Sequence, residues 1–313
     1  MGSEHEAYEV IVVDDGSTDG SSEIVRSFPC RLIQQERHLG AARARNVGAS
    51  RAQGATLLFL DADCIVERDT LQRAERLIRE YGEKTVIGGT YAPHPYDPGF
   101  YNMVQSVFIH YSELKNPGAP DYIAAHLMVM SARAFGDSGG FPENFYPIIE
   151  DVEFSHRLRR AGYRLVMSPL LQVRHCFGFR RMADSLRNGY VKSRYWTMYS
   201  LGNRDLLADS GTASRELKIN VFSLFILAGL AAAASFASRG VWTGTAAFTV
   251  AVCNVFLNRN LLQLFFRTGG AGFGIRASLY YLFVYPLAVG AGGLAGLLAF
   301  ARQRYSAPGG RNT

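Results

Sequence analysis

Short apolar runs alternate with helical patterns over the first 180 residues of the chain. Five runs have the length and composition of β-strands, and these are Glu9–Val13, Arg31–Gln34, Thr56–Leu60, Thr85–Gly89 and Ile123–Met130. Apolar positions recur with helical spacing in four segments, which are Ser21–Phe28, Gly40–Ala52, Asp69–Tyr81 and Val152–Ala161. The run TLLFL at 56–60 is apolar throughout, as expected for a strand covered on both faces of a mostly parallel sheet. Alternating strands and helices therefore predict an α/β domain.

The polarity pattern changes in the last third of the chain. Three apolar segments are expected to form transmembrane helices, at about 220–238, 241–266 and 277–301. Residues 220–238 contain no charged side chain, and their length is close to the roughly 20 residues that cross a bilayer. The second segment is marginal because it contains Asn254 and the polar sequence Asn-Arg-Asn at 258–260. We therefore expect two or three membrane-spanning helices.

The net charge of +6 and the pI near 9.2 would also fit a nucleic-acid-binding protein. However, Glu216 is the last acidic residue, and 8 of the 33 Lys and Arg residues follow it, which leaves 25 of them against all 27 Asp and Glu before that point. The basic excess thus coincides with the most apolar part of the chain. This pattern is typical of a membrane protein, and no nucleic-acid partner is expected.

A three-span arrangement suits the positive charges of one loop but not those of the C-terminal tail. If the N-terminal domain faces the cytosol, three spans place the loop with Arg267 and Arg276 in the cytosol, as the positive-inside rule favours. The C-terminal tail, with Arg302, Arg304 and Arg311, would then lie outside, which the rule disfavours. Two spans combined with a re-entrant or interfacial segment would remove this conflict.

Residues 181–215 connect the α/β pattern to the apolar segments. Basic side chains are interleaved there with Tyr190, Tyr195, Trp196 and Tyr199. Such a mixture is typical of an amphipathic helix that lies at the level of the lipid headgroups. The alternative is an ordinary packed helix of the soluble domain.

Pairs of acidic residues stand where two predicted strands end. Asp14 and Asp15 follow the first strand, and Asp61 and Asp63 follow the strand at 56–60. Ligands of open α/β sheets bind at the carboxyl ends of the strands. Two carboxylates separated by one residue in a turn can approach one hard cation, which keeps open positions for phosphate oxygens. The four cysteines have no CxxC spacing, so neither a zinc site nor a disulfide framework is expected.

A third acidic pair, Glu150 and Asp151, stands at the start of a predicted helix. The helix dipole favours an ionised carboxylate at this end. An ionised Asp beside a bound hydroxyl is a suitable general base. Each acidic element alone is weak evidence, because paired acids at a strand end also occur in receiver-type phospho-acceptor pockets.

Taken together and in order, five segments of the chain closely resemble family 2 glycosyltransferases of the GT-A fold. They are VVDDGSTDGS at 12–21, GAARARNVGAS at 40–50, FLDADC at 59–64, GGFPENF at 139–145 and EDVEFSHRLRRAGYRL at 150–165. The resemblance covers about residues 7–180. It implies a GT-A catalytic domain at 1–180, followed by the interfacial segment at 181–215 and a membrane domain at 216–313.

The resemblance assigns roles to individual residues. The donor nucleotide is expected to contact Asp14, Asp15, Arg45 and Asp61. A Mg²⁺ or Mn²⁺ ion is expected at Asp61 and Asp63, with His175 as a third ligand; a purely structural histidine is an equally good alternative for His175. Asp151 matches the catalytic base of the family, with Glu150 beside it.

The implied activity is transfer of a sugar, with inversion, from a nucleotide-diphosphate sugar to a membrane-associated acceptor such as a polyprenyl-linked glycan or a lipid. Such an enzyme would serve cell-envelope glycan synthesis as a multi-pass protein of the plasma (inner) membrane, with its catalytic domain facing the cytoplasm. The processive synthases of this family carry a QxxRW motif, whereas the nearest sequence here is KSRYW at 192–196. Transfer of a single sugar is therefore favoured.

One departure from the family pattern keeps an alternative open. Family members carry an apolar strand and a helix before the Asp-Asp-Gly strand, and here only eight residues precede that strand. The GT-A domain is therefore expected to be N-terminally incomplete. A non-catalytic relative that binds nucleotide sugars or glycans at the membrane is the alternative function.

Overall fold

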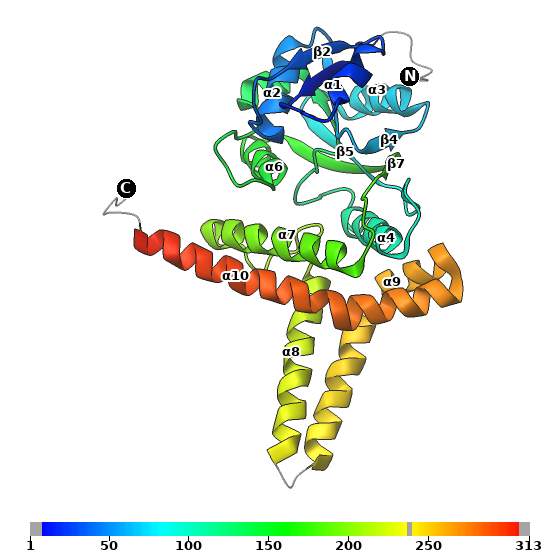
Figure 1. Ribbon diagram of the computed structural model, residues 1–313, viewed down its shortest axis with the longest axis vertical. Coiled ribbons are helices and arrows are strands. Elements are labelled where there is room, and N and C mark those ends of the chain that lie inside the picture. The colour runs from blue at the N-terminus through cyan, green and yellow to red at the C-terminus, as the bar shows by residue number, and fades with distance from the viewer. Residues whose placement is uncertain (1–7, 237–239, 307–313) are drawn as a thin grey trace. The chain divides into compact units, whose positions relative to one another are not determined.

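The computed structural model describes residues 8–236 and 240–306 (Figure 1). The chain forms two compact units. The N-terminal unit comprises residues 1–92 together with 113–176, and the C-terminal unit comprises 93–112 together with 177–313. The sequence pattern predicted contiguous domains and gave no sign that 93–112 would join the later part of the chain.

Seven strands build the described part of the N-terminal unit. They are β1 (Ile11–Asp14), β2 (Arg31–Gln34), β3 (Thr56–Leu60), β4 (Cys64–Val66), β5 (Thr85–Tyr91), β6 (Leu127–Ser131) and β7 (Arg164–His175). The strands β1 and β2 pair in parallel as a sheet of their own, and the other five form a second sheet in the order β3-β6-β5-β7-β4.

The larger sheet is mixed rather than mostly parallel as expected. The β5–β7 pairing is parallel, whereas β3–β6, β5–β6 and β4–β7 are antiparallel. Neighbouring parallel strands require a crossover connection. Here the chain reaches β6 through the excursion into the C-terminal unit and places it between β3 and β5 in the opposite direction. Runs of apolar residues reveal that a strand is buried but do not reveal its direction.

Five helices accompany these strands, and they are α1 (Ser21–Arg26), α2 (Ala41–Arg51), α3 (Thr70–Tyr81), α5 (Ala132–Ser138) and α6 (Glu150–Arg160). An aromatic cluster connects the sheet to α6. The ring centroid of Phe59 on β3 lies 5.3 Å from that of Phe141, and Phe141 lies 4.4 Å from Phe154 on α6. Such pairs each contribute roughly 0.5–1.5 kcal/mol beyond the burial of their surface. The cluster therefore fixes the start of α6 relative to the end of β3.

The strand predicted at 123–130 begins only at Leu127. Residues 123–126 have the sequence Ile-Ala-Ala-His, which is mostly apolar, yet their backbone does not join the sheet. The N–H of Ile123 donates to Ser155 Oγ, and the N–H of Ala125 donates to Asp151. Because side chains of α6 bind these backbone groups, strand pairing starts later than the apolar pattern suggests.

The described part of the C-terminal unit is helical. Its elements are most of α4 (Phe100–Leu114), α7 (Met182–Asn203), α8 (Arg215–Phe236), α9 (Gly240–Leu279), the π-helix η1 (Tyr280–Val284) and α10 (Tyr285–Ser306). The helix α9 is interrupted at Gly270, whose φ of 75° suits glycine and few other residues. The predicted helix within 181–215 is α7.

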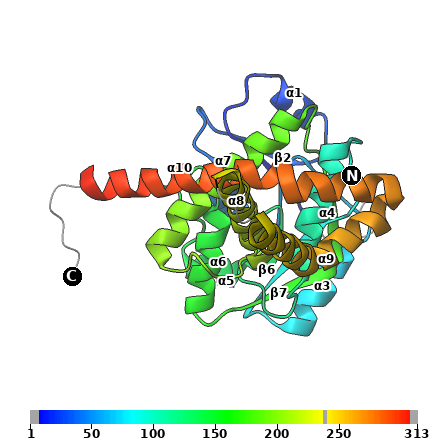
Figure 2. The same cartoon turned by 90° about the horizontal axis from the view of Figure 1, so that it is seen from below.

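Within the C-terminal unit, α8 and the first part of α9 run side by side, and α7 packs along α10 (Figure 1). Figure 2 shows that α10 runs across the pair formed by α8 and α9. Among the described residues, one continuous helical run, Trp242–Gln303, is long and apolar enough to cross a membrane. This run contains the interruption at Gly270 and the π-helix, so it is not one straight rod.

Candidate active site

Asp14 closes the turn that follows β1. Its Oδ1 accepts a hydrogen bond of 2.9 Å from the N–H of Ser17, and its Oδ2 accepts one from the hydroxyl of Ser22. The hydrogen bonds from Ser17 and Ser22 lower the pKa of Asp14 to about 2. The carboxylate is therefore ionised at any physiological pH and holds the start of α1 against the end of β1.

Asp15 organises the loop between β2 and α2. Its carboxylate accepts hydrogen bonds of 2.8 Å from the N–H groups of Leu39 and Gly40 and one of 2.9 Å from the side chain of Gln35. The ring of His38 lies 2.8 Å from the same carboxylate. Asp15 thus brings the loop at 35–40 to the carboxyl end of β1, next to Asp14.

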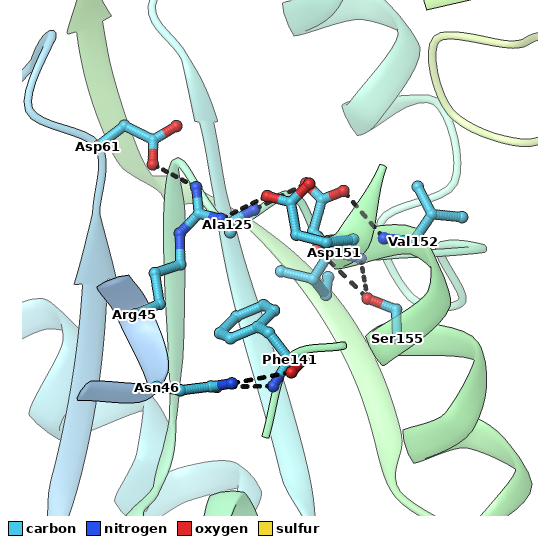
Figure 3. Close-up of polar contacts among 10 residues, drawn as sticks. Arg45, Asn46, Asp61, Ala125, Phe141, Asp151, Val152 and Ser155 are labelled. Atoms are coloured by element: carbon cyan, nitrogen blue, oxygen red, sulfur yellow. Dashed lines mark hydrogen bonds and ion pairs between the residues drawn. The ribbon is translucent and has the colours of Figure 1, made fainter. Parts of the chain in front are cut away.

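Arg45 on α2 connects two of the predicted site carboxylates (Figure 3). One nitrogen of its guanidinium lies 2.6 Å from Asp61 at the end of β3, and another lies 2.5 Å from Glu150 at the start of α6. The guanidinium also lies over the ring of Phe141, 5.5 Å from its centroid. Burial opposes the charge on Arg45, yet Asp61 and Glu150 raise its pKa above the ordinary value.

Asp151 is held in one orientation by backbone groups (Figure 3). The N–H of Ala125 donates to its Oδ2 at 3.1 Å, and the N–H of Val152 donates to its Oδ1 at 2.9 Å. Burial, followed by the charge of Glu150, raises the pKa of Asp151 to about 7. A carboxyl group with this pKa can exchange a proton near neutral pH, as a general base requires.

Two further side chains of α6 fix the segment at 121–126 that supplies the N–H of Ala125. The buried hydroxyl of Ser155 bonds to both the N–H and the carbonyl of Ile123, at 3.0 and 3.3 Å. The ring of His156 lies 3.0 Å from the carboxylate of Asp121. The sequence motif locates Asp151 but gives no indication of this segment, because its contribution is a backbone group.

Ile149, the residue before the acidic pair, has a left-handed backbone with a φ of 68°. This conformation is rare for a β-branched residue and costs on the order of 1–3 kcal/mol. Ile149 is also buried, at 9% exposure, so its side chain packs in spite of the strain. The left-handed residue turns the chain sharply into α6 and directs Glu150 and Asp151 into the site.

Asn46 explains the predicted motif at 139–145. Its amide donates to the carbonyl of Phe141 at 2.9 Å and accepts from the N–H of Phe141 at 2.8 Å (Figure 3). Gly140 has a φ of 71°, and a Cβ there would lie 2.6 Å from the oxygen of Asn46. Both the conformation and the close approach require glycine. Asn46 therefore holds the ring of Phe141 beneath the neighbouring Arg45.

Asp63 and His175 meet because β4 pairs with β7, which places Cys64 opposite His175. The imidazole Nε2 lies 3.3 Å from Asp63 Oδ2, and the ligand atoms of Asp63, Cys64 and His175 lie within 4.8 Å of one another. Partial burial raises the pKa of Asp63, but the hydrogen bond and charge of His175 outweigh burial and lower this pKa below its ordinary value. Burial and Asp63 raise the pKa of the Cys64 thiol well above its usual range. A thiolate is a soft ligand, so the donors that suit the harder ions Mg²⁺ or Mn²⁺ are the carboxylate and the imidazole.

A buried polar cluster next to His175 was not foreseen from the sequence; it consists of Thr90, Tyr91, Glu113 and His126. The ring of Tyr91 packs between His175 and His126, with centroid distances of 4.8 and 4.3 Å. Glu113, buried beside His126, accepts a hydrogen bond of 2.7 Å from the hydroxyl of Thr90. The ring of Tyr91 thus links the imidazole of His175 to this buried cluster. They are scattered from 90 to 175 and match no motif that the sequence could reveal.

The structure thus brings the predicted residues into three groups. Asp14 and Asp15 organise adjacent loops; Arg45, Asp61 and Glu150 form one ion-paired group next to Asp151; and Asp63 joins His175. The contact of Asp61 is with Arg45, although the sequence also assigned Asp61 to the metal together with Asp63. The roles of all eight residues in binding or chemistry remain predictions.

Replacing Arg45 with glutamine should destabilise the N-terminal unit by roughly 3 kcal/mol, because Asp61 and Glu150 would lose their shared cation in a partly dry site. The measurement is denaturant unfolding of the full chain in detergent. Arg43→Gln is the matched control on the same helix. Its pair with Glu143 is exposed, and it should cost less than about 1 kcal/mol. Equal losses for the two variants would contradict a stabilising role of the Arg45 bridge.

Comparison with known proteins bears on the family and the fold of the chain. The model of the glycosyl transferase family 2 matches residues 2–135. Glycosyltransferase GlyG of Streptococcus pneumoniae serotype 4 is 38% identical over 101 residues, which are 31% of this chain and 34% of that protein. Glycosyltransferase AglE of Haloferax volcanii is 29% identical over 172 residues, 51% of this chain and 54% of that protein. The chain therefore matches about a third to a half of the length of these relatives.

A solved structure extends the likeness to most of the chain. The mannosyltransferase PcManGT of Pyrobaculum calidifontis, in complex with GDP-Man and Mn²⁺, superposes with a TM-score of 0.54 over 93% of this chain and 78% of its own, at 16% identity. At this identity the likeness concerns the fold. The chain has the GT-A fold of this mannosyltransferase. The match of residues 2–135 to the family model, taken with the ordered motifs, supports a family 2 glycosyltransferase.

Proposed function

We propose that the chain is an inverting glycosyltransferase that moves one sugar from a nucleotide-diphosphate sugar to a membrane-associated acceptor. The observation that carries the proposal is the setting of Asp151. Two backbone N–H groups orient its carboxylate, and its pKa of about 7 suits proton transfer near neutral pH. The ion-paired Arg45, Asp61 and Glu150 lie beside it.

The donor nucleotide is assigned to the loops that Asp14 and Asp15 organise. Asp14 fixes the turn into α1, and Asp15 fixes the loop at 35–40. Both loops follow the carboxyl ends of parallel strands, where open α/β sheets bind their ligands. In this proposal the two carboxylates shape the pocket of the base and ribose and also offer their remaining lone pairs to the ribose hydroxyls.

The donor diphosphate is assigned to the groups around Asp61. Asp63, His175 and Asp61 would hold a Mg²⁺ or Mn²⁺ ion, and their carboxylate and imidazole donors fit such an ion. When bound, the ion acts as a Lewis acid toward the charge of the leaving diphosphate. Arg45 supplies a permanent positive charge in the same place, because its raised pKa keeps the guanidinium protonated. The mannosyltransferase of similar fold was solved with Mn²⁺.

The proposed role of Asp151 is to activate the acceptor. Its carboxylate takes the proton of the acceptor hydroxyl as that oxygen forms a bond to the anomeric carbon, and the bond from this carbon to the nucleoside diphosphate breaks. A single displacement inverts the configuration of the sugar. With a lipid phosphate as acceptor, the attacking oxygen is already ionised, and Asp151 then positions it. The apolar helices of the C-terminal unit support an acceptor at the membrane.

Replacing Asp151 with asparagine should reduce sugar transfer by about 10²-fold or more, because the general base is lost, while nucleotide binding changes little. Transfer is measured with a panel of nucleotide sugars and membrane extracts as acceptor, and binding by calorimetry. Asp137→Asn, on the exposed end of α5, is the matched control with unchanged transfer. An equal loss of binding and transfer in Asp151→Asn would argue against the base role. Absence of transfer by the unmodified chain with every donor would favour the non-catalytic, sugar-binding alternative.

The rate of transfer to a hydroxyl acceptor should fall as the pH falls through about 7. The base works in its ionised form, and the raised pKa of Asp151 means that protonation removes this form below that pH. At pH 6 the value of kcat/KM should be roughly a tenth of its plateau value above pH 8. A rate that stays constant from pH 5.5 to 8 would indicate that Asp151 positions the acceptor and does not accept its proton.

Replacing Asp63 with asparagine should raise the Mn²⁺ concentration needed for half-maximal activity by about tenfold or more. Cys64→Ser is the matched control, since a soft thiolate ligand suits Mn²⁺ poorly. Direct Mn²⁺ binding, followed by electron paramagnetic resonance, provides a second measurement that does not depend on turnover. A loss of Mn²⁺ affinity in Cys64→Ser that matches the loss in Asp63→Asn would identify the thiol as a ligand.

A further inference from the structure

Two helices of the C-terminal unit form a hairpin whose surface is apolar on several sides. The hairpin is defined here as residues 219–236 of α8 and 240–258 of α9. Its exposed large apolar side chains are Ile219, Phe222, Phe225, Ile226, Trp242, Phe248, Val252, Val255, Phe256 and Leu257. Phe248 is 71% exposed and Trp242 is 75% exposed. Exposure of this kind around two paired helices suits a surrounding of lipid rather than a flat protein partner.

The length of the hairpin matches the thickness of a bilayer. Lys218 and Arg259 flank it, and no charged residue occurs in either of its helical arms. Each arm of 18 or 19 residues is about 27–29 Å long at 1.5 Å per residue. The hydrocarbon core of a bilayer is about 30 Å thick. Lys218 and Arg259 therefore stand at the same depth, where an interface with water is expected.

The helix α10 has two different faces. Leu287, Leu294, Leu297 and Leu298 are 47–59% exposed, and their spacing places them on one side of the helix. On another side, Gly292 and Gly296 allow close approach of α7, whose Tyr190 and Arg194 backbones they contact, and the hydroxyl of Ser193 on α7 donates to the carbonyl of Val289. The leucine face is thus turned away from α7.

A buried polar junction fixes the hairpin to the start of α10. The amide of Asn220 on α8 donates to the carbonyl of Tyr281 in η1 at 2.7 Å, and Asn254 donates to Asn220 at 2.8 Å. The hydroxyl of Tyr281 donates to Asn258 at 3.0 Å. Asn220 and Asn258 lie within two residues of Lys218 and Arg259. The junction therefore lies at the charged end of the hairpin, where the helix that continues into α10 turns across it (Figures 1 and 2).

We propose that the hairpin is the membrane-crossing segment of the described chain, and that α10 lies in the headgroup region with its leucine face toward the acyl chains. This inference rests on the membrane attachment included in the proposed function. A helix that runs across the hairpin at its charged end cannot cross the same bilayer along with it. The sequence pattern predicted that residues 277–301 span the membrane; here they are assigned to the interface instead.

The distribution of positive charge supports this arrangement. With the hairpin as the one crossing among the described residues, Lys218, Arg259, Arg267, Arg276 and Arg302 all stand on one side of the membrane. Three spans would separate Arg302 from the others, against the positive-inside rule. Basic residues beside an interfacial helix also favour anionic headgroups, by about 1 kcal/mol for each residue near the surface.

The number of crossings can be tested with tags at both ends of the full chain. The tagged chain is expressed in a bacterial membrane, and sealed right-side-out and inverted vesicles are treated with protease. Two crossings place both tags on the same side, so both should be cleaved in one vesicle type and both protected in the other. Cleavage of one tag in each vesicle type would mean an odd number of crossings and would overturn the inference.

The depth of α10 is tested in vesicles of phosphatidylethanolamine and phosphatidylglycerol that carry bromine near the headgroup or near the chain end. Leu294→Trp is compared with Phe248→Trp in the hairpin, both in a chain with Trp196 and Trp242 replaced by phenylalanine. Shallow bromines should quench position 294 most strongly, and deep bromines should quench position 248 most strongly. If deep bromines quench both positions most strongly, the interfacial position of α10 would be wrong, but the membrane attachment in the proposed function would stand. A chain that fails to float with vesicles would overturn the membrane attachment as well.

Discussion

The guanidinium of Arg45 lies between acidic groups that come from distant parts of the chain, and the geometry of the site depends on it. Asp61 ends β3 and Glu150 begins α6, and Asp151 follows directly. Two like charges 4 Å apart repel by about 4 kcal/mol in surroundings of intermediate dielectric constant. One partly buried cation between Asp61 and Glu150 offsets this repulsion and lets the carboxyl end of the sheet and the start of the helix approach each other. Phe141, held by Asn46, supports the same cation from below.

This bridge also sets the environment of Asp151. Burial and Glu150 raise the pKa of Asp151, whereas the positive charge of Arg45 lowers it. The proposed base therefore works with a pKa that balances two neighbours, one on its own helix and one on α2. A binding event that draws Asp61 or Arg45 toward a phosphate or a cation changes this balance. In the proposed function, donor binding would therefore alter the pKa of Asp151 through the same three side chains.

The sequence predicted the positions of the candidate site residues in the fold, but it did not predict the contacts between them. Ordered motifs placed Asp14, Asp61 and Asp151 at strand ends and a helix start, where the structure has them, because these positions depend on local structure. The segment at 123–126 reads as strand from its apolar residues, yet Ser155 and Asp151 bind its backbone from α6. The packing of Tyr91 between two histidines depends on strand order, which no local pattern encodes. The same limit applies to α10, whose composition fits a span although its neighbours turn it across the hairpin.

The left-handed conformation of Ile149 at the start of α6 affects the stability of the domain and the geometry of the site differently. Glycine would remove a backbone cost on the order of 1–3 kcal/mol. It would also remove a buried side chain that contributes roughly 1.5–3 kcal/mol. The two terms are of similar size and opposite sign, so replacing Ile149 with glycine should change the melting temperature of the domain little. The direction in which Glu150 and Asp151 enter the site would change more, since glycine at this turn can adopt several backbone conformations. Selection on thermal robustness alone would therefore not preserve isoleucine here, whereas selection on the accuracy of a chemical step would.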